Sequence, residues 1–256
     1  MKSFFSICRV NVLSLALIAV GATVIVSCSK LDNDNDQNMP VAGLMAFNLA
    51  PDQQALALTL DGNSLTNFPL PYTNFTGGYV TVYPGNRTFQ AFSSNSPSFQ
   101  PLASATATFD PDKYYSVFTI GADSNYRNVI VHDNFDSLPG NGKAYIRYVN
   151  AIIDSTKPLT VVISAGGSDV VNQPASYAFV SEFVAITPGE VNIGISNNGG
   201  TDADRTITLE QNKVYTVLLT GLPGTTPASD LIRFITNGTL AEEPNTSRSA
   251  ARSVAN

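Results

Sequence analysis

Residues 113–121 read KYYSVFTIG, and residues 213–221 read KVYTVLLTG. Both stretches are rich in β-branched and aromatic residues and end in glycine. In the first stretch the side chains alternate, so that Val117 and Thr119 face one way while Phe118 and Ile120 face the other. This pattern predicts a β-strand. Its return 100 residues later indicates that the chain contains two copies of one structural unit.

Other blocks return in the same order. AGLMAFN at 42–48 corresponds to AYIRYVN at 144–150, and YVTVYPG at 79–85 corresponds to FVAITPG at 183–189. About seven such blocks in roughly 100 residues are typical of an immunoglobulin-like sandwich. We therefore expect an all-β fold of two tandem immunoglobulin-like antiparallel β-sandwiches, one over residues 41–138 and one over residues 142–240.

The joint between the two units is expected at 136–142, DSLPGNG, because glycine, proline and an Asn-Gly pair favour turns. Its shortness predicts sandwiches that lie end to end. Tyr115 and Tyr215 each follow an apolar strand residue by six positions across a turn. That placement is typical of a tyrosine corner, in which the phenol bonds the backbone. Ordinary strand tyrosines are the alternative.

The amino-terminal segment has the pattern of an export signal. Lys2 and Arg9 precede an apolar run over 13–26, which is too short for a comfortable membrane span. IVSC at 25–28 resembles the lipobox of bacterial lipoproteins, which implies a signal peptide over 1–27 and lipidation of Cys28. The protein is therefore expected in the cell envelope, anchored to the outer membrane by lipid.

Two flanking segments are predicted to be disordered, since they lack apolar periodicity: an acidic tether over 28–40 and a tail over 241–256. The Asp- and Asn-rich tether also resembles the surface-export signal of Bacteroidota lipoproteins, which implies exposure on the cell surface.

Composition excludes several kinds of chemistry. The formal net charge is −6 and no Lys/Arg cluster is present, so a nucleic-acid partner is not expected. His132 is the only histidine, and Cys8 lies in the part expected to be removed. We therefore predict no metal site and no cofactor. His132 and Asp133 are adjacent on an expected strand and should point to opposite faces, which disfavours a catalytic dyad.

AYIRYVNA at 144–151, LDG at 60–62, the Pro-Gly turns and the Tyr-led strands resemble domain-of-unknown-function family 4397. The resemblance extends over nearly all of residues 42–240. It implies a β-sandwich of secreted and lipid-anchored bacterial proteins without an assigned activity, so it transfers no catalytic residue. The first half departs from the pattern by having Met45 where the second half has Arg147, and the second half lacks the Asp-Gly ending.

Aromatic residues gather in the loop over 67–79, where Tyr72, Phe75 and Tyr79 are candidates for contact with a glycan or a protein ligand. Capping of the core is the alternative role. A non-catalytic binding, adhesion or spacer function is the main prediction. The alternative is a glycan-acting hydrolase that uses loop or strand carboxylates, of which Glu182, Glu190 and Glu210 lie on or beside expected strands.

Two short motifs, DSL at 136–138 and DST at 154–156, resemble the acceptor sequence for O-linked glycans in Bacteroidota. Ser137 and Ser155 are therefore candidate glycosylation sites.

Overall fold

A computed structural model describes residues 39–95, 100–153, 158–197 and 201–241. Cys28, the expected signal peptide and Ser155 lie outside the described residues, as do most of the expected tether and tail. In the part that the structure describes, no helix has the length and apolar character needed to cross a membrane.

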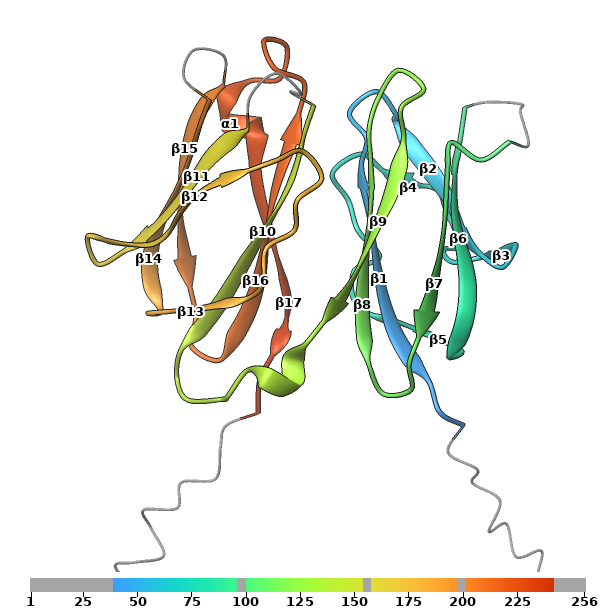
Figure 1. The fold of residues 1–256 in the computed structure, drawn as a ribbon, viewed down its shortest axis with the longest axis horizontal. Coiled ribbons are helices and arrows are strands. Elements are labelled where there is room, and N and C mark those ends of the chain that lie inside the picture. The colour runs from blue at the N-terminus through green and yellow to red at the C-terminus, as the bar shows by residue number, and fades with distance from the viewer. Residues whose placement is uncertain (1–38, 96–99, 154–157, 198–200, 242–256) are drawn as a thin grey trace, which may run out of the picture. The chain divides into compact units, whose positions relative to one another are not determined.

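The first sandwich consists of two sheets built from β1 to β9 (Figure 1). One sheet has the order β5-β1-β8-β9, and the other has the order β3-β2-β6-β7 with β4 also paired to β2. The strands are β1 (Ala42–Leu49), β2 (Ala55–Leu60), β3 (Asn63–Ser64), β4 (Leu70–Pro71), β5 (Val80–Val82), β6 (Gly85–Ser93), β7 (Ala103–Phe109), β8 (Tyr114–Ile120) and β9 (Arg127–Asp133).

The second sandwich repeats this plan with β10 to β17, in sheets of order β13-β10-β16-β17 and β12-β11-β14-β15. The strands are β10 (Ala144–Ile152), β11 (Leu159–Ala165), β12 (Ser168–Ala175), β13 (Val184–Ile186), β14 (Gly189–Ser196), β15 (Asp202–Leu209), β16 (Lys213–Gly221) and β17 (Ile232–Thr239). A short 3-10 helix, η1 (Phe135–Ser137), lies in the joint, and a one-turn helix, α1 (Ala228–Leu231), precedes β17.

The predicted fold class is confirmed, with one refinement. Most strand pairs are antiparallel, but β1 pairs with β8 and β10 pairs with β16 in parallel. The two parallel pairs share one register, since Met45 lies opposite Ser116 and Arg147 lies opposite Thr216. Parallel neighbours need a long crossover, and here the strands of the other sheet supply it.

Both predicted tyrosine corners are confirmed. The Tyr115 hydroxyl accepts a hydrogen bond from the backbone N–H of Asp110 at 3.0 Å. The Tyr215 hydroxyl accepts the equivalent bond from Glu210, also at 3.0 Å. Each bond ties the start of a buried strand to the end of a strand in the opposite sheet, so the repeat in sequence is also a repeat of local bonding.

Each sandwich has its own core, but the central strands are buried on both faces. Leu44 and Ala46 of β1 point into the first core, whereas Met45 and Phe47 point away from it and are nevertheless fully buried. They belong to an apolar layer shared by the two sandwiches, here called the shared layer: Met45, Phe47, Leu49, Phe118, Ile120, Val149, Ala151, Leu218 and Ile235. Burying one such large side chain contributes about 1.5–3 kcal/mol.

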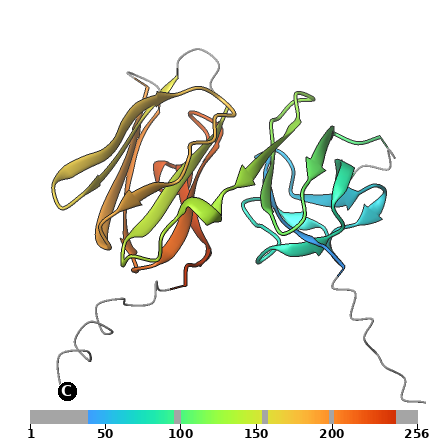
Figure 2. The same cartoon turned by 60° about the horizontal axis from the view of Figure 1, so that its bottom comes forward.

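The expectation that the sandwiches lie end to end is therefore wrong. The sheets that contain β1 and β10 contact each other through the side chains that point away from their own cores. A short joint limits how far apart the sandwiches can be, but it does not select the surfaces that meet. The apolar residues on the outward faces of β1, β8, β10 and β16 select them. The described residues from Pro40 onward form one compact unit (Figure 2).

Candidate functional site

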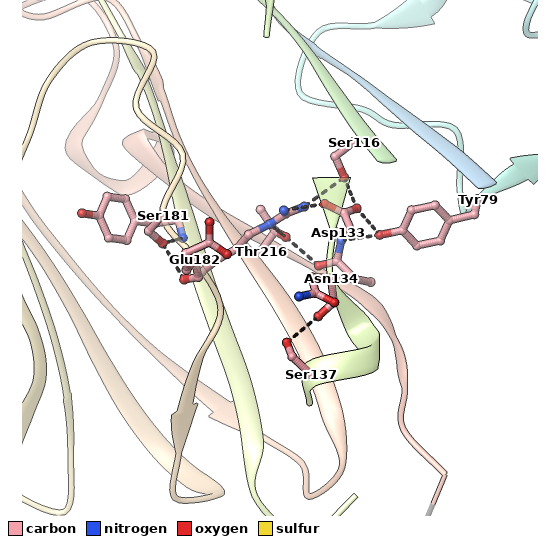
Figure 3. A network of polar contacts seen from close by, with 11 residues as sticks. Tyr79, Ser116, Asp133, Asn134, Ser137, Ser181, Glu182 and Thr216 are labelled. Atoms are coloured by element: carbon pink, nitrogen blue, oxygen red, sulfur yellow. Dashed lines mark hydrogen bonds and ion pairs between the residues drawn. The ribbon is translucent and has the colours of Figure 1, made fainter. Parts of the chain in front are cut away.

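A buried polar cluster lies in the contact between the sandwiches, here called the polar bridge (Figure 3). The first sandwich supplies its residues from β8, the end of β9 and the loop before β5, and the second from β10, β16 and β17. The members are Tyr79, Ser116, Asp133, Arg147, Thr216 and Asn237. Only 2% of the Arg147 side chain and 0% of the Asp133 side chain are exposed.

Arg147 uses all three guanidinium nitrogens in the polar bridge. Nη1 donates to Asp133 Oδ1, Nη2 donates to Ser116 Oγ at 2.9 Å, and Nε donates to Thr216 Oγ1 at 3.0 Å. The guanidinium carbon also lies 4.4 Å from the centre of the Phe183 ring. A buried ion pair is tolerated when further hydrogen bonds satisfy its remaining donors and acceptors.

Asp133 is held by hydroxyl donors as well. Ser116 Oγ donates to Asp133 Oδ2 at 2.6 Å, and the Tyr79 hydroxyl donates to the same oxygen. Asn237 closes the cluster, because it accepts from Thr216 at 2.6 Å and donates to the Tyr79 hydroxyl at 3.3 Å. Burial first, and then the charge of Asp133, raise the pKa of Tyr79 above its usual value. The phenol therefore stays neutral and keeps donating.

The polar bridge joins the two halves of the chain. Its residues bond one another across the interface, so its evident role is to fix one sandwich on the other. The predicted separation of His132 from Asp133 is confirmed, since His132 is exposed and Asp133 is buried on the opposite face. Sequence reasoning did not find the bridge. The available signal was the replacement of an apolar residue, Met45, by Arg147 within a strand repeat.

The three predicted ligand-contact residues are half-buried and pack between the sandwiches. Tyr72 places its hydroxyl 3.2 Å from Thr220 Oγ1 of the second sandwich. Phe75 stacks on Phe47 with ring centres 5.6 Å apart, and Tyr79 belongs to the polar bridge. This is the capping role left open by the sequence. Ligand contact by these residues stays a prediction, confined to the atoms that remain exposed.

The aromatic rings that do face solvent lie nearby. Phe68 is 82% exposed and Tyr83 is 61% exposed. They line two adjoining hollows, of about 440 and 300 Å³ respectively, which share Leu65 and Val80. We call the two hollows together the edge trough, because their linings include residues of β3, β4 and β5. These three strands lie at the open edge of the first sandwich (Figure 1).

A charge pair is fixed at the Tyr83 end of the edge trough. Arg87 Nη1 donates to Asp61 Oδ2 at 3.1 Å, while its Nε and Nη2 donate to the carbonyls of Tyr83 and Pro84. The Thr88 N–H donates to Asp61 Oδ1 at 2.8 Å. This backbone bond first, and then Arg87, lower the pKa of Asp61, so its carboxylate is ionised at neutral pH. Both side chains are held in place although they are partly exposed.

The other candidate residues are not members of the edge trough or the polar bridge. Glu182, Glu190 and Glu210 are exposed, and Glu210 forms an ion pair with Lys213 at 2.8 Å. Ser137 is exposed in η1, where its hydroxyl donates to the Asn134 carbonyl at 3.0 Å. Among the described residues, no group of three or more His, Cys, Asp or Glu side chains is placed to hold a metal ion.

The fold and its contacts define a tandem β-sandwich protein whose halves are joined by a buried ion pair. The family described as "Domain of unknown function (DUF4397)" matches residues 42–161. The predicted relationship to this family is thereby confirmed. The match runs from the first residue of β1 through the first sandwich and ends within β11 of the second.

No curated protein matches the chain. A crystal structure from Bacteroides ovatus ATCC 8483, named as a candidate cell adhesion protein, is 11% identical, with 80% of this chain and 99% of that chain covered and a TM-score of 0.22. A second such structure, from Bacteroides eggerthii DSM 20697, is also 11% identical, with coverages of 79% and 96% and a TM-score of 0.24. At these TM-scores the two similarities support no conclusion about this chain.

Proposed function

We propose that this protein is a non-catalytic binding module of the cell envelope, held in the outer membrane by acyl chains on Cys28. The observation that carries the binding role is the edge trough, where two exposed aromatic rings accompany a fixed Asp61–Arg87 pair. Exposed aromatic surface next to fixed polar groups is the usual composition of a recognition site.

The second sandwich provides an internal comparison that supports this assignment. The repeat places Thr187 at the position of Tyr83, and the strand registers place Ser164 and Val191 at those of Asp61 and Arg87. Val191 is fully buried. The same fold therefore forms without the aromatic ring and without the charge pair, so folding alone does not require these residues in the first sandwich.

The polar bridge and the shared layer add a second argument. They fix the first sandwich on the second through buried contacts, so the edge trough is presented on a rigid support. A preorganised surface loses less conformational entropy when a ligand binds. A rigid pair of sandwiches also suits a spacer that holds the trough away from a membrane.

Membrane attachment can be tested by metabolic labelling. Labelled palmitate should enter the native protein and should not enter a Cys28→Ala variant. Two or more acyl chains give durable attachment, since each buried CH₂ contributes about 0.8 kcal/mol. Absence of label from the native protein would refute the anchor.

Surface exposure has its own test. Protease added to intact cells should digest the protein, whereas an inner-leaflet protein of the same cells should survive. Complete protection would contradict display on the surface. Release of new reducing ends from soluble polysaccharides by the purified protein would overturn the non-catalytic role.

We also propose O-linked glycans on Ser137 and Ser155, on the strength of the two acceptor motifs and the exposure of Ser137. The native protein should then have a mass above that of polypeptide plus lipid, and Ser137→Ala should remove one glycan mass. A native mass equal to polypeptide plus lipid would exclude both sites.

A further inference from the structure

We infer that the edge trough binds a short segment of an uncharged saccharide chain. This inference rests on the proposed binding function and names its ligand. The adjoining hollows of about 300 and 440 Å³ are in the size range of small-molecule sites. Phe68 lines one hollow and Tyr83 the other, so each hollow offers an aromatic surface to the C–H face of a sugar ring.

The polar groups of the trough suit sugar hydroxyls, which both donate and accept hydrogen bonds. Asp61 supplies a carboxylate, Asn63 an amide and Ser64 a hydroxyl in the hollow that Tyr83 lines. Three N–H groups of Arg87 are already used within the protein, and a guanidinium has five, so two remain as donors. Leu65 and Val80 add apolar surface to the lining of the same hollow.

The charges of the trough favour a neutral ligand. Asp61 and Arg87 neutralise each other at 3.1 Å, so the site offers no net charge to attract an anionic or cationic group. A uronic or sialic acid would have to compete with the Asp61 carboxylate for Arg87. An uncharged sugar uses both partners without separating them.

An extended peptide fits this edge less well. The Gly43 N–H donates to the carbonyl of Lys113, the residue before β8, so it points away from β5. Thr81, which lies opposite Gly43 in β5, therefore turns its own N–H and C=O away from β1. Main-chain groups alternate in direction along a strand, and β5 has three residues. Thr81 is therefore the one residue of β5 whose main-chain N–H and C=O point away from the sheet. The carbonyl of Tyr83, the next outward position, accepts from Arg87 Nε. Strand addition, which depends on a row of main-chain bonds, therefore has little to pair with.

The test is calorimetric titration of the full mature lipoprotein, purified in detergent, with neutral tetrasaccharides of glucose, mannose, galactose and xylose. At least one of these tetrasaccharides should bind to the protein. Phe68→Ala and Tyr83→Ala should each weaken binding about tenfold or more, because each removes an aromatic surface. Phe179→Ala, which removes an exposed ring of the second sandwich, is the matched control and should leave the affinity unchanged. Equal melting temperatures will show that the variants are folded.

Three outcomes would overturn the inference. The first is a folded protein that binds no sugar in the panel, and the second is binding that survives both Phe68→Ala and Tyr83→Ala. The third is tighter binding of acidic sugars, or of extended peptides that lose affinity in the same two variants. Peptide binding at the edge trough would refute the inference that the ligand is a saccharide, but it would agree with the proposed binding function. Palmitate labelling tests the lipid anchor separately.

Discussion

Replacing Arg147 by methionine should expose how much the polar bridge contributes to stability. Methionine is long, unbranched and apolar, and it already occupies the corresponding position of the first sandwich as Met45, fully buried in the shared layer. The change therefore tests charge and hydrogen bonding with little change in shape. It removes three donors at once and leaves Asp133 with the hydroxyls of Ser116 and Tyr79.

Removing one partner of a buried ion pair lowers the free energy of unfolding by about 3–5 kcal/mol, because the remaining charge is left buried without its partner. Asp133 keeps two donors but is fully buried, so we expect a loss within that range. In a protein of this size about 1 kcal/mol lowers the melting temperature by roughly 2–4 °C. The Arg147→Met variant should therefore melt roughly 6–20 °C below the wild type.

Urea unfolding of the wild type, Arg147→Met and the double variant Arg147→Met/Asp133→Asn is the appropriate assay. Asparagine keeps an acceptor for Ser116 and Tyr79 but removes the unpaired charge, so the double variant should recover about 2 kcal/mol or more of the loss. Arg233→Met is the control, since it breaks an exposed pair with Asp230 and should cost at most about 1 kcal/mol. A loss below about 1 kcal/mol in Arg147→Met, or no recovery in the double variant, would refute this account.

Three further predictions concern single residues. The raised pKa of Tyr79 means that above pH 10 the unfolded chain loses a proton that the folded chain keeps at this residue. Tyr79 should therefore contribute a fall in stability of about 1.4 kcal/mol per pH unit until the folded phenol ionises. Urea midpoints that fall as steeply in Tyr79→Phe as in the wild type between pH 9.5 and about 11 would contradict this. Tyr115→Phe and Tyr215→Phe should each lower the free energy of unfolding by about 0.5–1.5 kcal/mol, since each removes one hydrogen bond to a backbone N–H. A difference above about 2 kcal/mol between the two variants in chemical denaturation would show that the two tyrosine corners are not equivalent. Gly121→Ala should lower the melting temperature more than Gly221→Ala does. The new Cβ would meet a backbone carbonyl at 2.2 Å in the first variant and side-chain atoms at 2.8 Å in the second. A larger loss of melting temperature in Gly221→Ala would refute this prediction.

The sheets were predictable because their signals are local. Alternation in 113–121 and 213–221 predicted strands, and the structure has β8 and β16 there. The tyrosine corners followed from the spacing of Tyr115 and Tyr215 to the preceding strands. The parallel pairing of β1 with β8 did not follow, because alternation does not specify which strand lies beside which.

The candidate site was less predictable, because it depends on which faces meet. Tyr72, Phe75 and Tyr79 look like loop aromatics in the sequence, and only the contact between the sandwiches shows that they pack there. Phe68 belongs to the same loop and remains exposed. Sequence composition cannot separate these cases, since neighbouring residues of one loop can point into the protein or into solvent.

The ion pair also gives the two halves different identities. Asp133 lies on the first sandwich and Arg147 on the second, at a position where the first has Met45. Two molecules that met through their first sandwiches would each bury a carboxylate opposite a methionine. Two that met through their second sandwiches would bury two guanidinium groups without a carboxylate. The face that each half presents to the other therefore disfavours pairing with a second copy of itself, because such a pair would bury charges without partners.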